Sequence, residues 1–280
     1  MTSFPAPTAL GGARPLSLVE GYIFDLDGTI YLGNELLPGA ADLIARLRDL
    51  DRRILFLSNN PTRGNTEYVR KLAGFGIAIE PREMLNTVDT MTAWLLRHHP
   101  DATVFPISEE PLKLALAESG IRMSENAEEI DIVIASYDRT FDYRKLQIAF
   151  DAIAVHKRAR LVTTNPDRFC PFPNGRGEPD AGAIIGAIEG CTGVKCEQNV
   201  GKPDPFMLDA ALARLGLAAH QCVMVGDRLM TDIRMAIDAG MPSALVLTGE
   251  TTREMLAAHP EPAHPTWVLD RVDEILPAGV

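Results

Sequence analysis

Residues 22–29 read YIFDLDGT, so an apolar run ends in two aspartates, Asp25 and Asp27, that are one residue apart. A short uninterrupted apolar run is typical of a strand buried on both faces of a parallel sheet. The two carboxylates would then lie where that strand leaves the core. Because neighbouring carboxylates repel each other, this pairing raises the question of what offsets their charge, although Asp-Gly-Thr alone is also common at a turn or at the start of a helix.

Short apolar strands alternate with amphipathic helices on both sides of this stretch. Residues 53–60 (RILFLSNN), 222–227 (CVMVGD) and 243–249 (SALVLTG) have the strand pattern, and residues 38–50 and 231–240 have helical periodicity. Alternation of this kind predicts a parallel sheet covered by helices on both faces, joined by right-handed crossovers. The expected fold class is therefore α/β, with a doubly wound, Rossmann-like core.

The chain has 280 residues, enough for a core and a second, smaller domain. Residues 85–180 have their own helix–strand rhythm, and their strands lack the paired acids seen elsewhere. We predict that they form an inserted α/β cap domain, that 18–84 and 181–280 form the core, and that 1–17 are a lead-in. Within the insert, the Pro, Asn and Gly content of residues 170–177 predicts a loop.

The composition indicates which kinds of partner the protein is not expected to bind. The net charge is −11 with both signs interspersed, which argues against nucleic acid because backbone binding needs a basic surface. No signal peptide and no apolar run long enough for a membrane helix is recognised, so we expect a cytoplasmic protein without a membrane partner. The four cysteines contain no CxxC pair and are expected to be free thiols, with zinc at Cys191 and Cys196 as a weak alternative.

Polar side chains follow several of the predicted strands. In an open parallel sheet the carboxyl ends of the strands share one edge, and ligands bind there. The side chains expected at this edge are Asp25, Asp27, Ser58, Asn59, Lys202, Asp227 and Asp232. Carboxylates suit Mg²⁺, which binds through one or two of them together with substrate phosphate.

This set matches the needs of phosphate ester hydrolysis. Asp25 would attack phosphorus, Asp27 would move protons as general acid and base, and Lys202 would neutralise the charge of the phosphoryl group. Each residue also has a structural interpretation: a turn at Asp27, a helix cap at Ser58, a surface lysine, or a first-turn acid at Asp232. Their joint occurrence, each after a strand or before a helix, favours the functional interpretation.

Four segments of the chain resemble sequence motifs of a known protein family. FDLDGT, LSNN, GKPDP and VGDRLMTD are similar to the four motifs of the haloacid dehalogenase superfamily of phosphatases, in their usual order. DGTIYLGNELLPGA and LVLTGETT resemble its NagD or p-nitrophenylphosphatase branch, which carries a large αβ (class II) cap between the second and third motifs. The resemblance implies a Rossmann-like core with a strand order near 3-2-1-4-5.

The resemblance also implies a role for each motif residue. Asp25 would be nucleophile and metal ligand, and Asp27 would be the general acid and base and bind Mg²⁺ through its main-chain carbonyl. Ser58 and the Asn59 amide would hold the phosphoryl group, with Lys202 stabilising its charge. The remaining metal-site residues would be Asp227 and Asp232, the latter directly or through water.

Substrate choice is expected to lie in the cap. By resemblance, the candidates for specificity are Asp138, Tyr143, Asn165, Asp167 and Arg168. Packing of Tyr143 and turn formation by Asn165 and Asp167 are the alternatives. The expected substrate is a small phosphorylated metabolite: a sugar phosphate, phosphoglycolate or glycerol phosphate, a nucleotide monophosphate or pyridoxal phosphate. A phosphotransferase or mutase, and a non-catalytic binding protein, remain as alternatives, and a homodimer formed through the cap is a family-level expectation.

Overall fold

A computed structural model describes residues 17–172, 176–260, 263–277 and 279. The chain divides into two compact units. The first comprises residues 1–57, 69–84 and 208–280, and the second comprises 58–68 and 85–207. Among the described residues, no helix has both the length and the apolar character needed to cross a bilayer.

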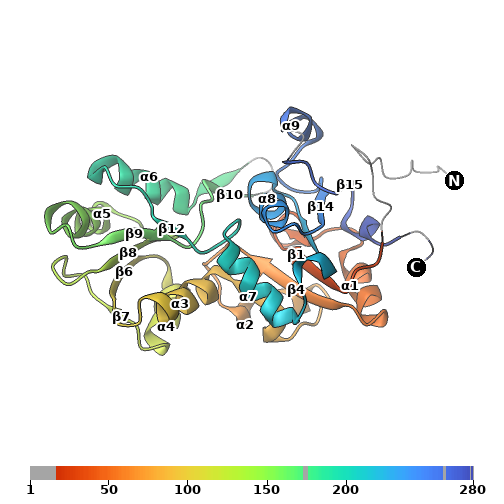
Figure 1. The fold of residues 1–280 in the computed structure, drawn as a ribbon, viewed down its shortest axis with the longest axis horizontal. Helices are drawn as coiled ribbons and strands as arrows, with labels where there is room; N and C mark the ends of the chain where they lie inside the picture. Colours follow the sequence, from red (N-terminus) through yellow and green to blue (C-terminus); the bar gives the residue numbers. More distant parts are fainter. Residues whose placement is uncertain (1–16, 173–175, 261–262, 278, 280) are drawn as a thin grey trace. The chain divides into compact units, whose positions relative to one another are not determined.

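The first unit is built on a six-stranded sheet (Figure 1). Its order is β15-β14-β13-β1-β4-β5. Counted along the chain this is 3-2-1-4-5 with a sixth strand added, so the predicted doubly wound core is confirmed. The strands are β1 (Gly21–Asp25), β4 (Arg53–Ser58), β5 (Met84–Asn86), β13 (Cys222–Gly226), β14 (Ser243–Val246) and β15 (Trp267–Leu269).

The central strand β1 fixes the position of the first two aspartates. It pairs in parallel with β4, where Asp25 lies opposite Leu57, and with β13, where Phe24 lies opposite Val225. Ile23 and Phe24 are fully buried, as the apolar run predicts. Polar residues that follow β1 and β13 therefore leave the core at the same edge of the sheet.

Helices and short turns complete the connections between these strands. The apolar face of α9 packs with strand residues Leu245 and Val268 in one cluster that also includes Leu229. The helices are α1 (Ala40–Asp49), α2 (Asn65–Gly74), α7 (Pro205–Leu215), α8 (Arg234–Asp238) and α9 (Arg253–Ala258), and a β-hairpin is formed by β2 (Tyr31–Leu32) and β3 (Glu35–Leu36). A π-helical turn, Leu229–Ile233, leads directly into α8.

The second unit contains a five-stranded parallel sheet of order β12-β9-β8-β6-β7. Alternate residues of β8 face opposite sides: Ile132 and Ile134 join one apolar cluster, whereas Val133 and Ala135 join the other. Helices α3 and α4 cover the first side and α5 and α6 the second (Figure 1). The elements are α3 (Thr87–His98), β6 (Thr103–Ile107), α4 (Glu110–Glu118), β7 (Arg122–Met123), β8 (Ile132–Ala135), α5 (Tyr143–Phe150), β9 (Arg160–Thr163), β10 (Phe169–Pro171), β11 (Gly177–Pro179), α6 (Ala181–Thr192) and β12 (Gln198–Asn199).

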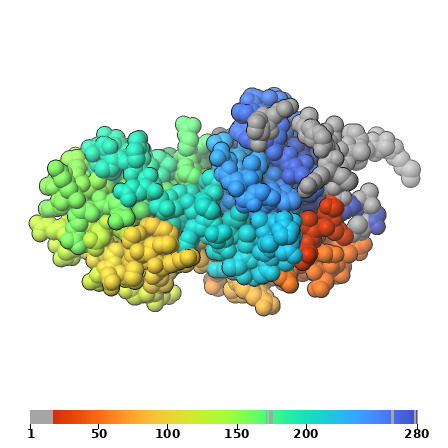
Figure 2. Space-filling view, viewed as in Figure 1, coloured from red at the N-terminus to blue at the C-terminus, as the bar shows by residue number. Residues whose placement is uncertain are grey.

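The end of the insert differs from the boundary that we placed after residue 180. Helix α6 buries Ile184 and Ile188 against the second sheet, and β12 pairs with β9 in that sheet. Residues 181–207 therefore belong to the second unit, because their apolar groups are buried there. In the space-filling view, the α6 segment (teal) contributes to the surface of that unit (Figure 2).

The loop predicted for residues 170–177 is also corrected. Strands β10 and β11 form an antiparallel pair in which Cys170 lies opposite Glu178 and Pro171 opposite Gly177. Residues 173–175 lie outside the described part of the chain. Pro and Asn-Gly residues marked the connection, but the strands that it joins are too short for a periodic signal.

The packing of α6 generates a first prediction. Ile188→Ala should lower the free energy of unfolding by about 2–5 kcal/mol, because it removes a buried side chain and leaves a cavity. Ile188→Val should cost only about 0.5–1.5 kcal/mol. Urea denaturation of both variants measures the difference. Equal stability of the alanine variant and the unaltered protein would show that α6 does not contribute to the core of the second unit.

Candidate active site

The two aspartates of the opening stretch occupy different environments. Asp25 is the last residue of β1 and is 8% exposed. Its Oδ2 atom accepts a long hydrogen bond of 3.5 Å from the Thr29 hydroxyl. Asp27 is half-buried, and its Oδ2 atom accepts a hydrogen bond of 3.3 Å from the Tyr31 hydroxyl. The structure therefore places one carboxylate at the end of β1 and holds the other through Tyr31 of β2, which follows the intervening turn.

Two further carboxylates meet Asp25 at this edge. Asp227 follows β13, and Asp232 lies in the π-helical turn that precedes α8. One oxygen of each of these three side chains lies within 4.8 Å of the others, and all three residues are buried. The sequence-predicted grouping of Asp25, Asp227 and Asp232 is thus present in space.

The electrostatics of this cluster favour a cation. Burial, and next the carboxylates of Asp25 and Asp232, raise the pKa of Asp227 well above its ordinary value. The Asp227 Oδ2 atom accepts the Glu250 N–H at 2.6 Å, but its buried Oδ1 atom accepts no hydrogen bond from the described residues. A buried anionic oxygen without a donor is costly. A hard cation such as Mg²⁺, which prefers oxygen ligands, fits this donor set.

Two glycines allow the backbone to approach Asp227 closely. A Cβ atom at Gly249 would lie 2.0 Å from Asp227 Oδ2, and one at Gly28 would lie 2.6 Å from it. Gly28 also has a φ of +89°, a backbone conformation that residues other than glycine rarely adopt. The Thr248 hydroxyl donates to the Gly28 carbonyl at 2.6 Å and joins the two segments. The sequence analysis predicted the aspartates, but it did not predict that the segment containing Gly249 would pack against Asp227.

The Ser58 side chain is held by a small hydrogen-bond network in the second unit. The Tyr68 hydroxyl donates to the Asn60 carbonyl at 3.1 Å and lies 3.1 Å from Ser58 Oγ. Ser58 Oγ accepts the Asn60 N–H at 3.2 Å. Ser58 is 3% exposed. These contacts fix the orientation of the hydroxyl at the end of β4.

The Asn59 side chain binds the backbone of Lys202. Its Oδ1 atom accepts the Lys202 N–H at 2.8 Å, and its Nδ2 donates to the Lys202 carbonyl at 3.1 Å and to Asp167 Oδ2 at 3.0 Å. Lys202 is 2% exposed. The side-chain amide is therefore occupied, so the predicted contact between Asn59 and a phosphoryl group would have to use the backbone N–H.

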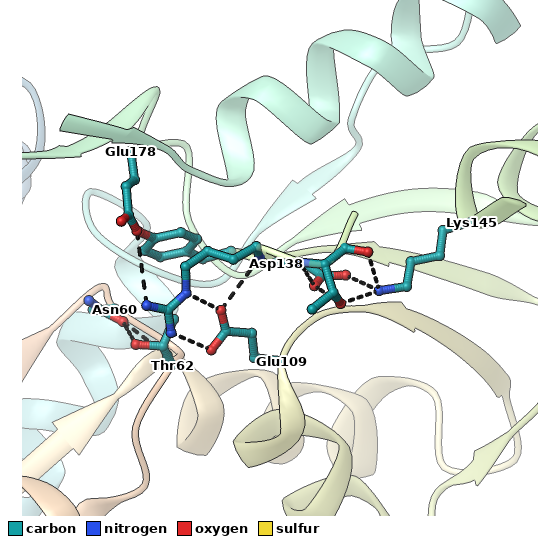
Figure 3. Close-up of polar contacts among 9 residues, drawn as sticks. Asn60, Thr62, Glu109, Asp138, Lys145 and Glu178 are labelled. Atoms are coloured by element: carbon teal, nitrogen blue, oxygen red, sulfur yellow. Dashed lines mark hydrogen bonds and ion pairs between the residues drawn. The ribbon is translucent and has the colours of Figure 1, made fainter. Parts of the chain in front are cut away.

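The five specificity candidates lie in different surroundings. Asp138 is buried and accepts a hydrogen bond of 2.6 Å from Lys145 Nζ (Figure 3). Although burial raises the pKa of Asp138, hydrogen bonds from Lys145 and Thr140 bring it below its ordinary value. Tyr143 is 80% exposed at the start of α5, and Arg168 is exposed at a cavity of about 640 Å³. The other two candidates, Asn165 and Asp167, are buried and hydrogen-bonded to each other.

One cluster in the second unit was missed by the sequence analysis. Arg139 donates from Nε and Nη2 to the two carboxylate oxygens of Glu109 at 2.6 and 2.8 Å, and its Nη1 lies 4.0 Å from Glu178. Glu109 and Glu178 thus approach the same guanidinium from different elements (Figure 3). Glu178 also accepts a hydrogen bond of 2.5 Å from Tyr137. The position of Glu109 just after β6 was an available signal, since Asp227 and Asn59 also come just after strands.

Comparison with known proteins agrees with this geometry. A haloacid dehalogenase-like hydrolase model matches residues 22–122, and a HAD-hydrolase-like model matches residues 199–275. The sugar-phosphatase AraL of Bacillus subtilis is 36% identical over 91% of this chain and 91% of its own.

Solved structures give the same result. A 4-nitrophenylphosphatase from Thermotoga maritima has a TM-score of 0.85 at 33% identity and covers 92% of this chain and 96% of its own. A glycerol phosphate phosphatase from Mycobacterium tuberculosis, solved in complex with magnesium, has a TM-score of 0.82 at 28% identity, covering 92% and 76%. The chain is a phosphoric monoester hydrolase of the haloacid dehalogenase superfamily and belongs to its NagD and p-nitrophenylphosphatase-like branch.

Proposed function

We propose that this phosphatase depends on Mg²⁺ and hydrolyses a small phosphorylated metabolite through an aspartyl-phosphate on Asp25. The observation that carries the proposal is the buried cluster of Asp25, Asp227 and Asp232, whose oxygens lie within 4.8 Å of one another. Three carboxylates in so small a space repel one another unless positive charge lies among them. The relatives named above are phosphatases, which favours hydrolysis over phosphotransfer.

The metal would be held by these three side chains and by the main-chain carbonyl of Asp27. The magnesium complex of the similar glycerol phosphate phosphatase supports this choice of ion. When bound, Mg²⁺ supplies positive charge that offsets the negative charge of the phosphoryl group and orients it. Asp232 would bind the metal directly or through a water molecule.

In the first step, a carboxylate oxygen of Asp25 attacks phosphorus. The bond between phosphorus and the ester oxygen breaks, and the leaving oxygen takes a proton from the Asp27 carboxyl group. The product alcohol leaves, and the phosphoryl group stays on Asp25. The hydrogen bond from Tyr31 to Asp27 Oδ2 restrains the side chain of the acid, which lies two residues after the nucleophile in the chain.

In the second step, water attacks the same phosphorus atom. Asp27, now a carboxylate, accepts a proton from this water, and the bond between phosphorus and the Asp25 oxygen breaks. Inorganic phosphate and the free Asp25 carboxylate result. The same residue therefore serves as acid in one step and as base in the next, and the proton that it takes from water restores the one that it gave to the leaving oxygen.

The residues of the second unit would bind the phosphoryl oxygens in both steps. Ser58 follows Leu57, the residue of β4 that lies opposite Asp25 in the sheet register, so chain connectivity supports its role. Lys202 would stabilise the charge of the phosphoryl group, and the Asn59 backbone N–H would donate to it. Sugar phosphates are the first substrates to test, because AraL is a sugar phosphatase.

The nucleophile assignment predicts that Asp25→Asn lowers kcat for p-nitrophenyl phosphate on the order of 10³-fold or more, since an amide does not form the intermediate. Phosphate release with and without Mg²⁺ measures this. Asp49→Asn, at an exposed position of α1, is the matched control and should keep full activity. Turnover by Asp25→Asn at the normal rate would exclude Asp25 as nucleophile.

The acid/base assignment predicts a different defect for Asp27→Asn. Turnover should fall by about 10²–10⁴-fold, because neither proton transfer is assisted, while inhibition by inorganic phosphate is largely kept. The rate of the first step should fall less for activated esters with good leaving groups than for sugar phosphates, because good leaving groups need less protonation. Comparing the two ester classes measures this, and an equal loss for both would argue against proton donation by Asp27 in that step.

The carboxylate cluster predicts that Asp227→Asn stabilises the metal-free protein. The raised pKa of Asp227 means that its contribution to stability is present at low pH and is lost as the pH rises through that pKa. The neutral variant should therefore have a Tm roughly 2–4 °C higher in EDTA at neutral pH. Mg²⁺ should raise the Tm of the unaltered protein but not that of the variant.

Thermal denaturation with EDTA or Mg²⁺ measures both effects. Asp238→Asn is the control, because Asp238 forms an exposed ion pair with Arg234 one helical turn away. It should respond to Mg²⁺ as the unaltered protein does. A variant Asp227→Asn that is destabilised in EDTA and still stabilised by Mg²⁺ would contradict a cation site at this cluster.

A further inference from the structure

A buried chain of hydrogen bonds links the segment after β9 to Lys202. Asp167 Oδ2 accepts from Asn59 Nδ2 at 3.0 Å and from Asn165 Nδ2 at 3.2 Å. Asn165 Nδ2 also donates to Asp180 Oδ1 at 3.1 Å. Asn59 in turn binds both the N–H and the carbonyl of Lys202. All these residues belong to the second unit.

The burial of this chain argues against direct substrate contact. Asn165 is fully buried, Asp180 is 5% exposed and Asp167 is 8% exposed. One oxygen of Asp167 already accepts two amide donors. A residue that selects among substrates has to offer its polar atoms to the ligand, whereas these atoms hold other side chains of the protein.

Close packing leaves Asn59 little freedom to move. A Cβ atom at Gly201 would lie 2.8 Å from Asn59 Oδ1 and 2.4 Å from the Thr164 carbonyl, so only glycine fits between them. The Thr87 hydroxyl donates to the Asn59 carbonyl at 3.0 Å. Because the Asn59 side chain spans the Lys202 peptide groups, a shift of Asn59 would move the lysine backbone.

We propose that Asp167 is a positioning residue for phosphoryl transfer, which acts through Asn59 on Lys202 and the phosphoryl-binding segment at Ser58. This rests on the function proposed above, and it replaces the expectation that Asp167 selects the substrate. A fixed carboxylate orients the Asn59 amide, and the amide fixes the Lys202 backbone in turn. Supporting shells of this kind hold reacting groups in productive geometry.

A positioning role and a substrate contact differ in how the loss of kcat/KM depends on the ester. A positioning defect acts on the phosphoryl group, which all substrates share. Asp167→Ala should therefore lower kcat/KM by the same factor for p-nitrophenyl phosphate, glycerol phosphate and a sugar phosphate, on the order of 10-fold to 100-fold. The inhibition constant for inorganic phosphate should rise as well. Loss of a substrate contact would change the ratios among the esters and leave phosphate inhibition intact.

A double-mutant cycle tests the route through Asn59. Asn59→Ala keeps the backbone N–H and removes only the side chain that Asp167 holds. If Asp167 acts through this side chain, adding Asp167→Ala to Asn59→Ala should change kcat/KM by no more than about twofold. If the two residues acted independently, the loss of kcat/KM in the double variant would equal the product of the two single losses. That result would overturn the proposal.

Asp131→Asn is the matched control for a general loss of stability in the second unit. Asp131 precedes β8 at the opposite end of the strand, where it accepts the Thr103 N–H at 2.9 Å and pairs with Arg158 at 2.8 Å. This variant should keep the phosphate inhibition constant. Because that constant is measured on the folded, active fraction, partial unfolding of Asp167→Ala would not change it.

The wild-type assay distinguishes the failure of this inference from that of the proposed function. No phosphate release from any ester by the unaltered protein would overturn the proposed function and this inference together. Normal activity with ester-dependent losses in Asp167→Ala, or with an unchanged phosphate inhibition constant, would overturn only the positioning role.

Discussion

Repulsion among the buried carboxylates of Asp25, Asp227 and Asp232 is the constraint on which the site depends. Parallel pairing of β1 with β13 brings the first two to one edge of the sheet, and the π-helical turn adds the third. Glycines at 28 and 249 let the backbone close around Asp227. Negative charge confined in this way favours a cation and disfavours a phosphate until that cation is bound.

The second unit contains groups of the opposite character. Lys202 and the hydroxyl of Ser58 suit an anion, and the Asn59 amide holds the lysine backbone in place. Asp167 orients that amide in the proposed mechanism. The chemistry that we propose divides accordingly: the first unit attacks phosphorus and moves protons, and the second unit binds phosphoryl oxygens.

The sequence predicted the features that depend on local pattern. Apolar runs ending in acids located β1 and β13 and placed Asp25 and Asp227 at one edge. The sheet that a helix covers could not be predicted from local pattern: the periodicity of α6 is the same whichever sheet it covers, so residues 181–207 were assigned to the core. The position of Glu109 after a strand could be read from the sequence, but its hydrogen bond with Arg139, 30 residues away, leaves no local signature.

Calorimetric titration of Mg²⁺ into EDTA-stripped protein tests the central claim most directly. We predict one Mg²⁺ bound per chain at neutral pH, with weaker binding as the pH falls and the buried carboxylates take up protons. Absence of binding, or binding that is unchanged when Asp227 is replaced by asparagine, would contradict the claim that this carboxylate cluster is a cation site.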